Sequence, residues 1–239
     1  NPLYRNFLDQ AVEQYIEGNF DLQRAYASND SPLDCTQALV DAFNEGVAFV
    51  SYVGHGARYI WQTGTTLATR AVDYEANFNP TRVDDLLNTP LLPIVFGITC
   101  FTNNFDNPDP RNCIGEKLIL SPVGGAIGCI ATSSYSYVHS DMNFCQLLFQ
   151  ALFEQRPTRV GDMFLAAMQS PQAGTDVRHE FLLLGDPASP LPLVPLPGAE
   201  RAIAQAANPG SASEEVTVAP AEEEAASPET APPASPEVD

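Results

Sequence analysis

The sequence predicts an α/β fold in which helices cover a mainly parallel sheet. Three short apolar runs lie between turn-forming segments, at residues 47–53, 91–99 and 125–131, and the first is rich in β-branched and aromatic residues with no helical period. Such runs are typical of strands that are buried on both faces. Each run is followed by a polar loop and then by a segment with helical apolar spacing. Strands that alternate with helices in this way favour parallel pairing.

Two helices are expected before the first strand. In residues 3–19, apolar side chains recur at the spacing of one helix face, and Gly18 offers an end. Residues 33–45 show the same kind of pattern, with Ser31 as a candidate cap and Gly46 directly after the last turn.

The rest of the chain divides into loops, helices and one more strand. Polar loops are expected at residues 57–79, 101–112 and 133–140, and long loops in compact domains are often functional. The sequence predicts helices at residues 80–87, 114–120, 141–155 and 158–169. The segment 181–187 is expected to form a short strand and a turn, in which Asp186 caps backbone amides.

The composition excludes several classes of protein. The chain has 239 residues, of which 30 are acidic and 11 are basic, giving a net charge of −19, so we expect no binding to nucleic acids. No apolar stretch is long enough to span a membrane. The five cysteines are odd in number and form no CxxC pair, which argues against a disulfide scaffold or a zinc ribbon. We therefore expect no metal centre.

The composition changes near residue 195. Residues 196–239 are dominated by Ala, Pro, Glu and Ser, lack aromatic residues and carry nine acidic residues against one basic residue. Such a segment buries too little apolar surface to offset the entropy that ordering costs. We expect a folded domain at 1–195 and a disordered acidic tail or linker at 196–239.

Candidate reactive residues follow the predicted strands where their carboxyl ends meet. His55, between Gly54 and Gly56, follows the first strand, Cys100 ends the second, and the 133–140 loop follows the third. Ligand sites in open parallel sheets lie beyond these ends. Thiolate attack on a carbonyl requires a sulfur, a base and amide donors for the oxyanion. The pattern predicts Cys100 as nucleophile, His55 as its proton-transfer partner, and the N–H groups of Gly56 and Cys100 as an oxyanion hole, because Gly56 has no side chain to block a substrate.

Each of these residues also has a structural interpretation. A single cysteine at the end of an apolar strand is commonly a small buried hydrophobe. His139 and His179 lack partners at metal-ligand spacing and are expected at the surface. Three side chains after Cys100 can hold calcium or remain solvated in turns, and their spacing, unlike that of an EF-hand, favours solvated turns: Asp106, Asn107 and Asp109.

Several blocks of the sequence, taken in order, resemble one peptidase family. They are VSYVGHGARYIW and PIVFGITCFTNNFD, followed by IGEKLIL, GGAIGCIATSS and FLLLGDP. Together they resemble the gingipain-type peptidases of the caspase-like clan, in which one strand ends in Gly-His-Gly and the next ends in the catalytic Cys. The resemblance covers about residues 36–194.

The resemblance implies a caspase-like three-layer sandwich whose amino-terminal strands are missing from this chain. It implies a cysteine endopeptidase in which His55 and Cys100 form the catalytic dyad and an acyl-enzyme is the intermediate. Gly56 would belong to the oxyanion hole, and Trp61 would either pack over the histidine loop or anchor it. The wall of the primary specificity pocket would come from residues 133–138 after the third strand, chiefly Tyr135 and Tyr137, with Ser133 and Ser134.

The resemblance also sets expectations about cofactors, partners and location. No cofactor is needed, although a structural calcium ion is compatible with the family, and the partners are protein or peptide substrates. Members are mostly bacterial and exported, which implies an extracellular or cell-surface location. The alternative is a non-catalytic or secretion-linked relative that acts as a surface processing, anchoring or binding module, and the presence of both His55 and Cys100 argues against it.

Overall fold

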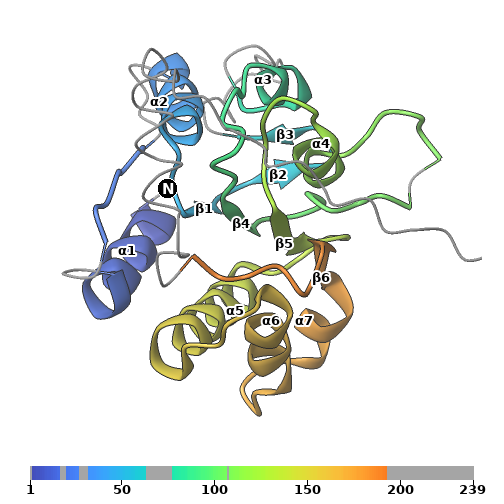
Figure 1. Cartoon of the computed structure of the whole chain (residues 1–239). Coiled ribbons are helices and arrows are strands. Elements are labelled where there is room, and N and C mark those ends of the chain that lie inside the picture. The colour runs from blue at the N-terminus through green and yellow to red at the C-terminus, as the bar shows by residue number, and fades with distance from the viewer. Residues whose placement is uncertain (1, 17–19, 27–31, 63–76, 107, 193–239) are drawn as a thin grey trace, which may run out of the picture. The chain divides into compact units, whose positions relative to one another are not determined.

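The protein forms a four-stranded sheet with the order β1-β4-β5-β6 (Figure 1). The computed structural model describes residues 2–16, 20–26, 32–62, 77–106 and 108–192. Three strands are parallel to their neighbours and the last is antiparallel, which confirms the mainly parallel sheet. The strands are β1 (Phe49–Val53), β4 (Ile94–Ile98), β5 (Gly128–Thr132) and β6 (Phe181–Gly185).

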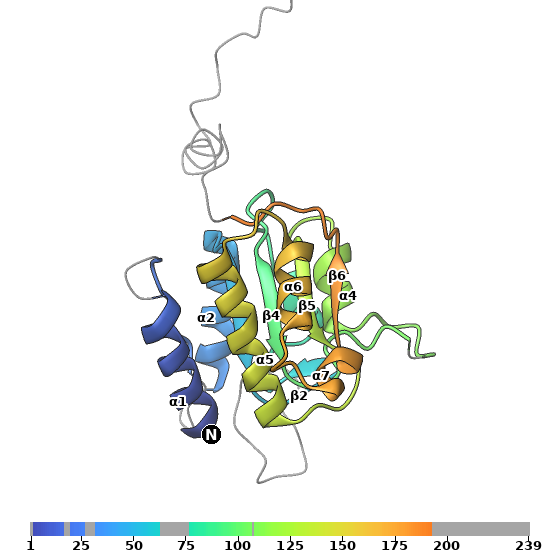
Figure 2. The same cartoon turned by 90° about the horizontal axis from the view of Figure 1, so that it is seen from below.

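Helices cover both faces of the sheet, so the predicted three-layer sandwich is confirmed (Figures 1 and 2). One face carries α2 (Pro32–Glu45), α3 (Pro80–Asp84) and α4 (Ile114–Leu120). The other carries α1 (Pro2–Ala11), α5 (Val138–Gln150), α6 (Val160–Gln169) and α7 (Thr175–Glu180). Two π-helical stretches continue α1 and α5, namely η1 (Val12–Ile16) and η2 (Ala151–Gln155).

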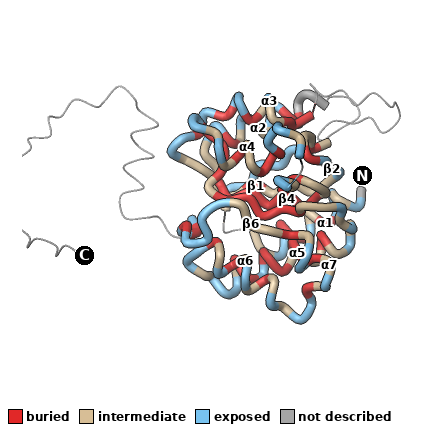
Figure 3. The backbone as a smooth tube through the Cα atoms, turned by 90° about the vertical axis from the view of Figure 1, so that its right-hand side faces the viewer, coloured by how far each residue is buried: buried red, intermediate tan, exposed pale blue. Residues whose placement is uncertain are grey.

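The two faces of the sheet are both apolar, as the continuous apolar runs predict. Along β4, Ile94, Phe96 and Ile98 pack toward α5 and α6, whereas Val95 packs toward α2 and α4. Alternate residues of a strand point to opposite faces, so burial on both sides requires an unbroken apolar run. All five residues of β4 and of β5 are buried, and Figure 3 shows buried residues both in the central strands and on the helices around them.

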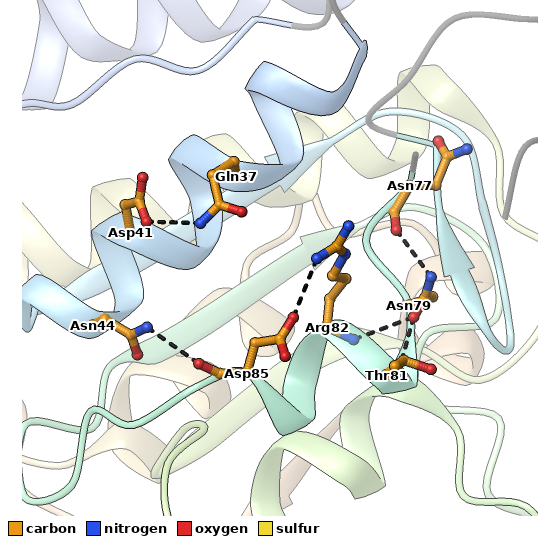
Figure 4. Close-up of polar contacts among 8 residues, drawn as sticks. All are labelled: Gln37, Asp41, Asn44, Asn77, Asn79, Thr81, Arg82 and Asp85. Carbon is orange, nitrogen blue, oxygen red and sulfur yellow. Dashed lines mark hydrogen bonds and ion pairs between the residues drawn. The ribbon is translucent and has the colours of Figure 1, made fainter. Parts of the chain in front are cut away.

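Polar contacts fix α3 against α2 (Figure 4). Asn79 begins α3, and its Oδ1 accepts from the N–H groups of Thr81 at 2.9 Å and Arg82 at 3.2 Å, a standard side-chain cap. From α2, the Asn44 side chain donates to the Asp85 carbonyl at 3.2 Å. The two helices are thereby joined at the point where the chain leaves α3 toward β4.

The structure differs from the predicted elements in four places. A hairpin of β2 (Gly56–Ala57) and β3 (Ile60–Trp61) replaces the start of the expected 57–79 loop. The helix α3 ends at Asp84 rather than 87, and α5 begins at Val138 rather than 141. The helix α7 is not predicted at all. Residues 17–19 with Gly18, Ser31, most of the 57–79 loop, and the 196–239 tail lie outside the described residues, so the domain boundary at 195 stays a prediction.

Candidate active site

The parallel pairing of β1 with β4 brings His55 and Cys100 to the same end of adjacent strands. Val53 pairs with Ile98 where the two strands end, and the Gly54 N–H donates to the Ile98 carbonyl at 3.4 Å. His55 and Cys100 each lie two residues beyond this pair, and neighbouring strands are about 4.8 Å apart. The two predicted residues therefore occupy corresponding positions at the carboxyl edge of the sheet.

Gly56 packs directly against the segment that leads to Cys100. A Cβ atom at Gly56 would lie 2.5 Å from Thr99 Oγ1 and 3.3 Å from the Cys100 carbonyl oxygen. The close approach of the two loops thus requires a residue without a side chain. The sequence predicts glycine here for substrate access, whereas in the structure the Thr99 side chain borders the position.

The backbone of His55 is fixed from two sides. His55 lies in the histidine hairpin, which we define as residues 54–62. Its carbonyl accepts hydrogen bonds from the Tyr52 hydroxyl at 2.6 Å and from the Gln62 N–H at 2.9 Å. The imidazole therefore projects from a backbone position that two separate donors hold.

Trp61 anchors the histidine hairpin to the turn that follows Cys100. Its indole has no exposed surface and stacks on the Tyr52 ring with centroids 4.7 Å apart. The indole Nε1–H donates to Thr102 Oγ1 at 2.7 Å. Of the two roles considered for Trp61, the structure supports the loop anchor, because the buried indole joins the segments that carry His55 and Cys100.

The pairing inside the hairpin leaves the Gly56 N–H pointing outward. Gly56 pairs with Trp61 across the hairpin, but the Trp61 N–H donates to the Phe78 carbonyl at 2.8 Å. Gly56 and Trp61 are therefore a non-hydrogen-bonded pair, in which both N–H groups face away from the partner strand. This orientation is compatible with the predicted oxyanion donor.

The imidazole of His55 is exposed and contacts Tyr4 of α1. Tyr4 Oη lies 3.4 Å from His55 Nε2, and the two rings meet edge to face with centroids 5.5 Å apart. Burial raises the pKa of Tyr4, and negative charge on Cys100 and Asp141 raises it further. Tyr4 thus lies near both predicted catalytic side chains. Among the described residues, no hydrogen bond joins His55 directly to Cys100.

Cys100 is the accessible cysteine of the protein, because it is half-buried and the other four are buried. Burial raises the pKa values of Cys113 and Cys145 to about 12, and it also raises those of Cys35 and Cys129. The thiolate is the reactive form of cysteine. The buried four are therefore poor nucleophiles.

The backbone turns sharply immediately after Cys100. Phe101 has a φ of 59°, in the left-handed region that bulky residues seldom adopt. Its N–H donates to the Ser134 carbonyl at 3.0 Å, and its ring meets the Tyr135 ring edge to face at 4.5 Å. Strained backbone of this kind clusters at functional sites, and here the loop after β5 holds the strained residue in place.

The four predicted pocket residues divide into two kinds. We call their segment the 133–137 loop. The hydroxyl of Ser133 donates to the Glu180 carbonyl at 3.2 Å, and that of Ser134 donates to the Tyr135 carbonyl at 3.2 Å. Both serine side chains are therefore engaged in holding the loop backbone.

The two tyrosines of the 133–137 loop point into solvent. Tyr135 is 76% exposed and Tyr137 is 70% exposed, so neither is the core aromatic that a purely structural role implies. Because Tyr135 packs on the residue after Cys100, its ring lies beside the predicted nucleophile. The structure thus brings all the predicted catalytic and pocket residues to one edge of the sheet.

The chain matches a known peptidase family over most of its described length. The sequence profile of peptidase family C25 matches residues 4–192. The chain belongs to peptidase family C25. Gingipain R2 of Porphyromonas gingivalis is 24% identical over 163 residues, which are 63% of this chain and 20% of the relative. Gingipain R1 of the same species is 24% identical over the same share of this chain and 15% of its own length.

Solved structures of gingipains share the fold of this C25 chain. The Arg-specific cysteine proteinase gingipain R (RgpB) superposes with a TM-score of 0.59 and 21% identity, covering 80% of this chain and 41% of that one. A complex of RgpB pro- and mature domains gives a TM-score of 0.58 and 22% identity, covering 78% and 42%. These matches confirm the predicted caspase-like fold and the resemblance to gingipains. The chain spans about a fifth of the first of these curated relatives.

The sequence-based prediction of the C25 site assigns no individual role to three residues near Cys100. They are Tyr4, Ser136 and Asp141. Tyr4 comes from a helix more than fifty positions before His55, and no local pattern links the two. Ser136 lies inside the predicted 133–140 loop, and its position between two tyrosines is the only signal that marks it. Asp141 is 5% exposed, and a buried carboxyl is rare without a partner.

The other candidate residues have structural or surface positions in the C25 fold. His139 and His179 are exposed on α5 and α7. Asp186 accepts from the Ala188 N–H at 2.8 Å, which confirms the predicted turn cap. Asp109 forms an ion pair with Arg111 at 2.6 Å, and Asp106 accepts from Asn104 at 2.8 Å; Asn107 lies outside the described residues.

The described part of the chain holds neither a metal-binding cluster nor a membrane-spanning helix. No group of three or more His, Cys, Asp or Glu side chains is arranged there to hold a metal ion. No helix there is both long and apolar enough to cross a membrane. A cavity of about 330 Å³ does not include Cys100 in its lining, which is formed by Tyr59, Pro80, Thr81, Arg111, Asn112 and Lys117. Its cations are already paired, Arg111 with Asp109 and Lys117 with Asp84.

Proposed function

We propose that the protein is a cysteine endopeptidase in which Cys100 is the nucleophile and His55 transfers protons. The Cys100 thiol gives its proton to the imidazole, and the thiolate attacks the carbonyl carbon of a peptide bond. The N–H groups of Gly56 and Cys100 stabilise the oxyanion of the tetrahedral intermediate. His55 then protonates the leaving amine, and an acyl-enzyme remains on the sulfur.

Water completes the reaction. His55 accepts a proton from the water molecule that attacks the thioester, and the carboxylate product leaves as the thiol is restored. No cofactor takes part in either half of the reaction. The substrates are proteins or peptides that lie along the 133–137 loop, where Tyr135 and Tyr137 offer exposed aromatic surface. We propose an extracellular or cell-surface location on the basis of the family.

One observation carries this proposal: the register of β1 and β4. The pairing of Val53 with Ile98 sets the histidine and the cysteine at corresponding positions beyond adjacent strands. The contact of Gly56 with Thr99 and with the Cys100 carbonyl supports it, because the two loops touch there. Tyr4 contacts His55, and negative charge on Cys100 raises the pKa of Tyr4. Both observations support a shared location for the His55 and Cys100 side chains.

Substitution of the two residues tests the proposal. Cys100→Ala and His55→Ala are each expected to reduce peptide hydrolysis by the full-length protein at least about a thousandfold, with melting temperatures close to that of the wild type. His139→Ala is the matched control, because His139 is also an exposed histidine; it should retain activity. Hydrolysis by Cys100→Ala at the wild-type rate would show that this cysteine is not the nucleophile.

A further inference from the structure

Three atoms of Ser136 lie close to the sulfur of Cys100. The Ser136 N–H donates to Sγ at 3.4 Å, the carbonyl oxygen lies 3.7 Å from Sγ, and Oγ lies 3.6 Å from it. The N–H is a fixed donor that favours negative charge on sulfur. The carbonyl is a fixed acceptor that favours the protonated thiol. The hydroxyl is the variable group, because it can donate or accept.

The same hydroxyl is hydrogen-bonded to a buried carboxyl. Ser136 Oγ lies 2.6 Å from Asp141 Oδ2. Asp141 lies in the first turn of α5 and is 5% exposed. Its second oxygen, Oδ1, is buried and has no hydrogen-bond partner among the described residues. Within the described part of the chain, the carboxyl thus has one hydrogen bond, and the hydroxyl that makes it also lies 3.6 Å from the Cys100 sulfur.

Several titratable groups face Asp141. Burial raises its pKa to about 6, the hydrogen bond from Ser136 opposes this rise, and the charges of Glu180 and Asp176 on α7 add to it. Tyr4 of α1 and Cys145 of α5 also sense the charge of Asp141. Both protonation states of Asp141 are therefore accessible near neutral pH.

The Ser136 hydroxyl has one proton, so it can donate a hydrogen bond to Asp141 or to Cys100 but not to both at once. When Asp141 is ionised it can only accept, so the Ser136 hydroxyl donates to it and presents a lone pair to the sulfur. That arrangement favours the thiol, whose S–H can donate to Oγ. When Asp141 is protonated it donates to Oγ, and the hydroxyl proton is then free to point at the sulfur, where it stabilises the thiolate.

We propose that Ser136 and Asp141 form a hydroxyl relay that sets the reactivity of Cys100, with Asp141 as a positioning residue that acts through the direction of the Ser136 hydroxyl. This inference rests on the proposed function only for its biological purpose, since the reactivity of a thiol is measurable without peptide hydrolysis. A buried acid that is not in contact with the sulfur thereby controls the charge on it.

A double-mutant cycle on alkylation tests the relay. In the full-length protein, iodoacetamide modification of Cys100 is followed by mass spectrometry of its peptide at pH 7.5. The Asp141→Asn amide can donate to Ser136 Oγ as a protonated carboxyl does, so the rate should rise by up to about tenfold. In the Ser136→Ala background the same Asp141→Asn change should alter the rate by less than about twofold, because the relay is absent.

Comparing the effect of Asp141→Asn in the wild-type and Ser136→Ala backgrounds distinguishes the relay from a simple loss of charge. If Asp141→Asn raises alkylation equally with and without Ser136, its charge acts directly through space and the relay is wrong. If Asp141→Asn leaves the rate unchanged while melting temperature is also unchanged, the relay is likewise wrong. Ser170→Ala is the matched control, because its hydroxyl bonds to the Gln172 side chain and not to sulfur; it should alkylate as the wild type does.

The pH profile supplies a second readout that a structural role would not change. In the wild type, the alkylation rate should show a step near pH 6 that follows the ionisation of Asp141. Asp141→Asn and Ser136→Ala should each remove the step near pH 6, and an unaltered profile in both contradicts the relay. A normal relay in a protein that cleaves no peptide would overturn the proposed peptidase function alone.

Discussion

Trp61 and Tyr135 are both large aromatic residues close to the site, yet one has no exposed surface and the other is 76% exposed. Trp61 belongs to the histidine hairpin, where the stacked Tyr52 and the bond to Thr102 hold the segment through side chains. The 133–137 loop is held mainly through its backbone, as in the bond from the Phe101 N–H to the Ser134 carbonyl.

The difference separates positioning from recognition. A side chain that is committed to the core cannot also contact a substrate, so Trp61 fixes the geometry of the histidine hairpin and does not bind substrate. The 133–137 loop is held by its own backbone groups and by its serine hydroxyls, and its two tyrosine side chains remain available for binding. If this division is correct, substitutions in the hairpin will reduce stability and turnover together, whereas substitutions of the exposed tyrosines will change substrate affinity alone.

The largest effect is expected from Trp61→Ala. Removing a fully buried indole leaves a cavity and breaks the bond to Thr102 Oγ1, which should cost about 4 kcal/mol of folding free energy. Denaturant unfolding measures the loss. Peptide hydrolysis should fall as well in the fraction that stays folded, because the hairpin loses its connection to the Cys100 turn. A loss below about 1 kcal/mol would contradict the anchoring role.

Gly56→Ala should have the next largest effect. The new methyl group would lie 2.5 Å from Thr99 Oγ1, so the hairpin and the end of β4 must separate. Overpacking of this kind costs about 2 kcal/mol, and a shift of His55 relative to Cys100 should lower kcat by about a hundredfold. The double variant Gly56→Ala with Thr99→Ser retains the Oγ clash and tests whether the methyl contact matters. Wild-type kcat in Gly56→Ala would show that the close approach is not needed.

The sequence predicts the part of the site that follows from strand ends. Gly54 and Cys100 each mark the end of an apolar run, and parallel pairing then places His55 and Cys100 at corresponding positions on the same edge of the sheet. The β2–β3 hairpin escapes prediction because two-residue strands have no measurable period. The Ser136–Asp141 contact escapes for a different reason: α5 begins at Val138 without a side-chain cap on Tyr137, so its first turn looks like loop in the sequence.

The pH dependence of stability should distinguish Asp141 from its neighbour. The folded pKa of Asp141 is raised to about 6 by burial, so the folded state binds more protons than the unfolded chain between about pH 4 and 6. As the pH rises from about 4 to 6, the free energy of unfolding of the wild type should therefore fall by about 2 kcal/mol relative to that of Asp141→Asn. Asp176 is the control, because its pKa is shifted in the opposite direction. The hydrogen bond from Ser140 is the main cause that lowers the pKa of Asp176, so the stability that Asp176 contributes is lost as the pH falls. The same trend in wild type and Asp141→Asn would contradict the assignment.

The smallest change in stability is expected from Tyr135→Ala. Its effect on kinetics is the sharpest test of the difference between the histidine hairpin and the 133–137 loop. A side chain that is 76% exposed contributes within about 0.5 kcal/mol to folding, and only its edge contact with the Phe101 ring is lost. If the ring forms the pocket wall, KM for peptides should rise about tenfold while kcat stays nearly constant, because ground-state and transition-state binding fall together. Tyr137→Ala, at a similarly exposed position, tests whether the effect is specific to the ring beside Cys100. A fall in kcat with unchanged KM would instead mean that Tyr135 positions the strained turn at Phe101, and that the loop shares the hairpin's role.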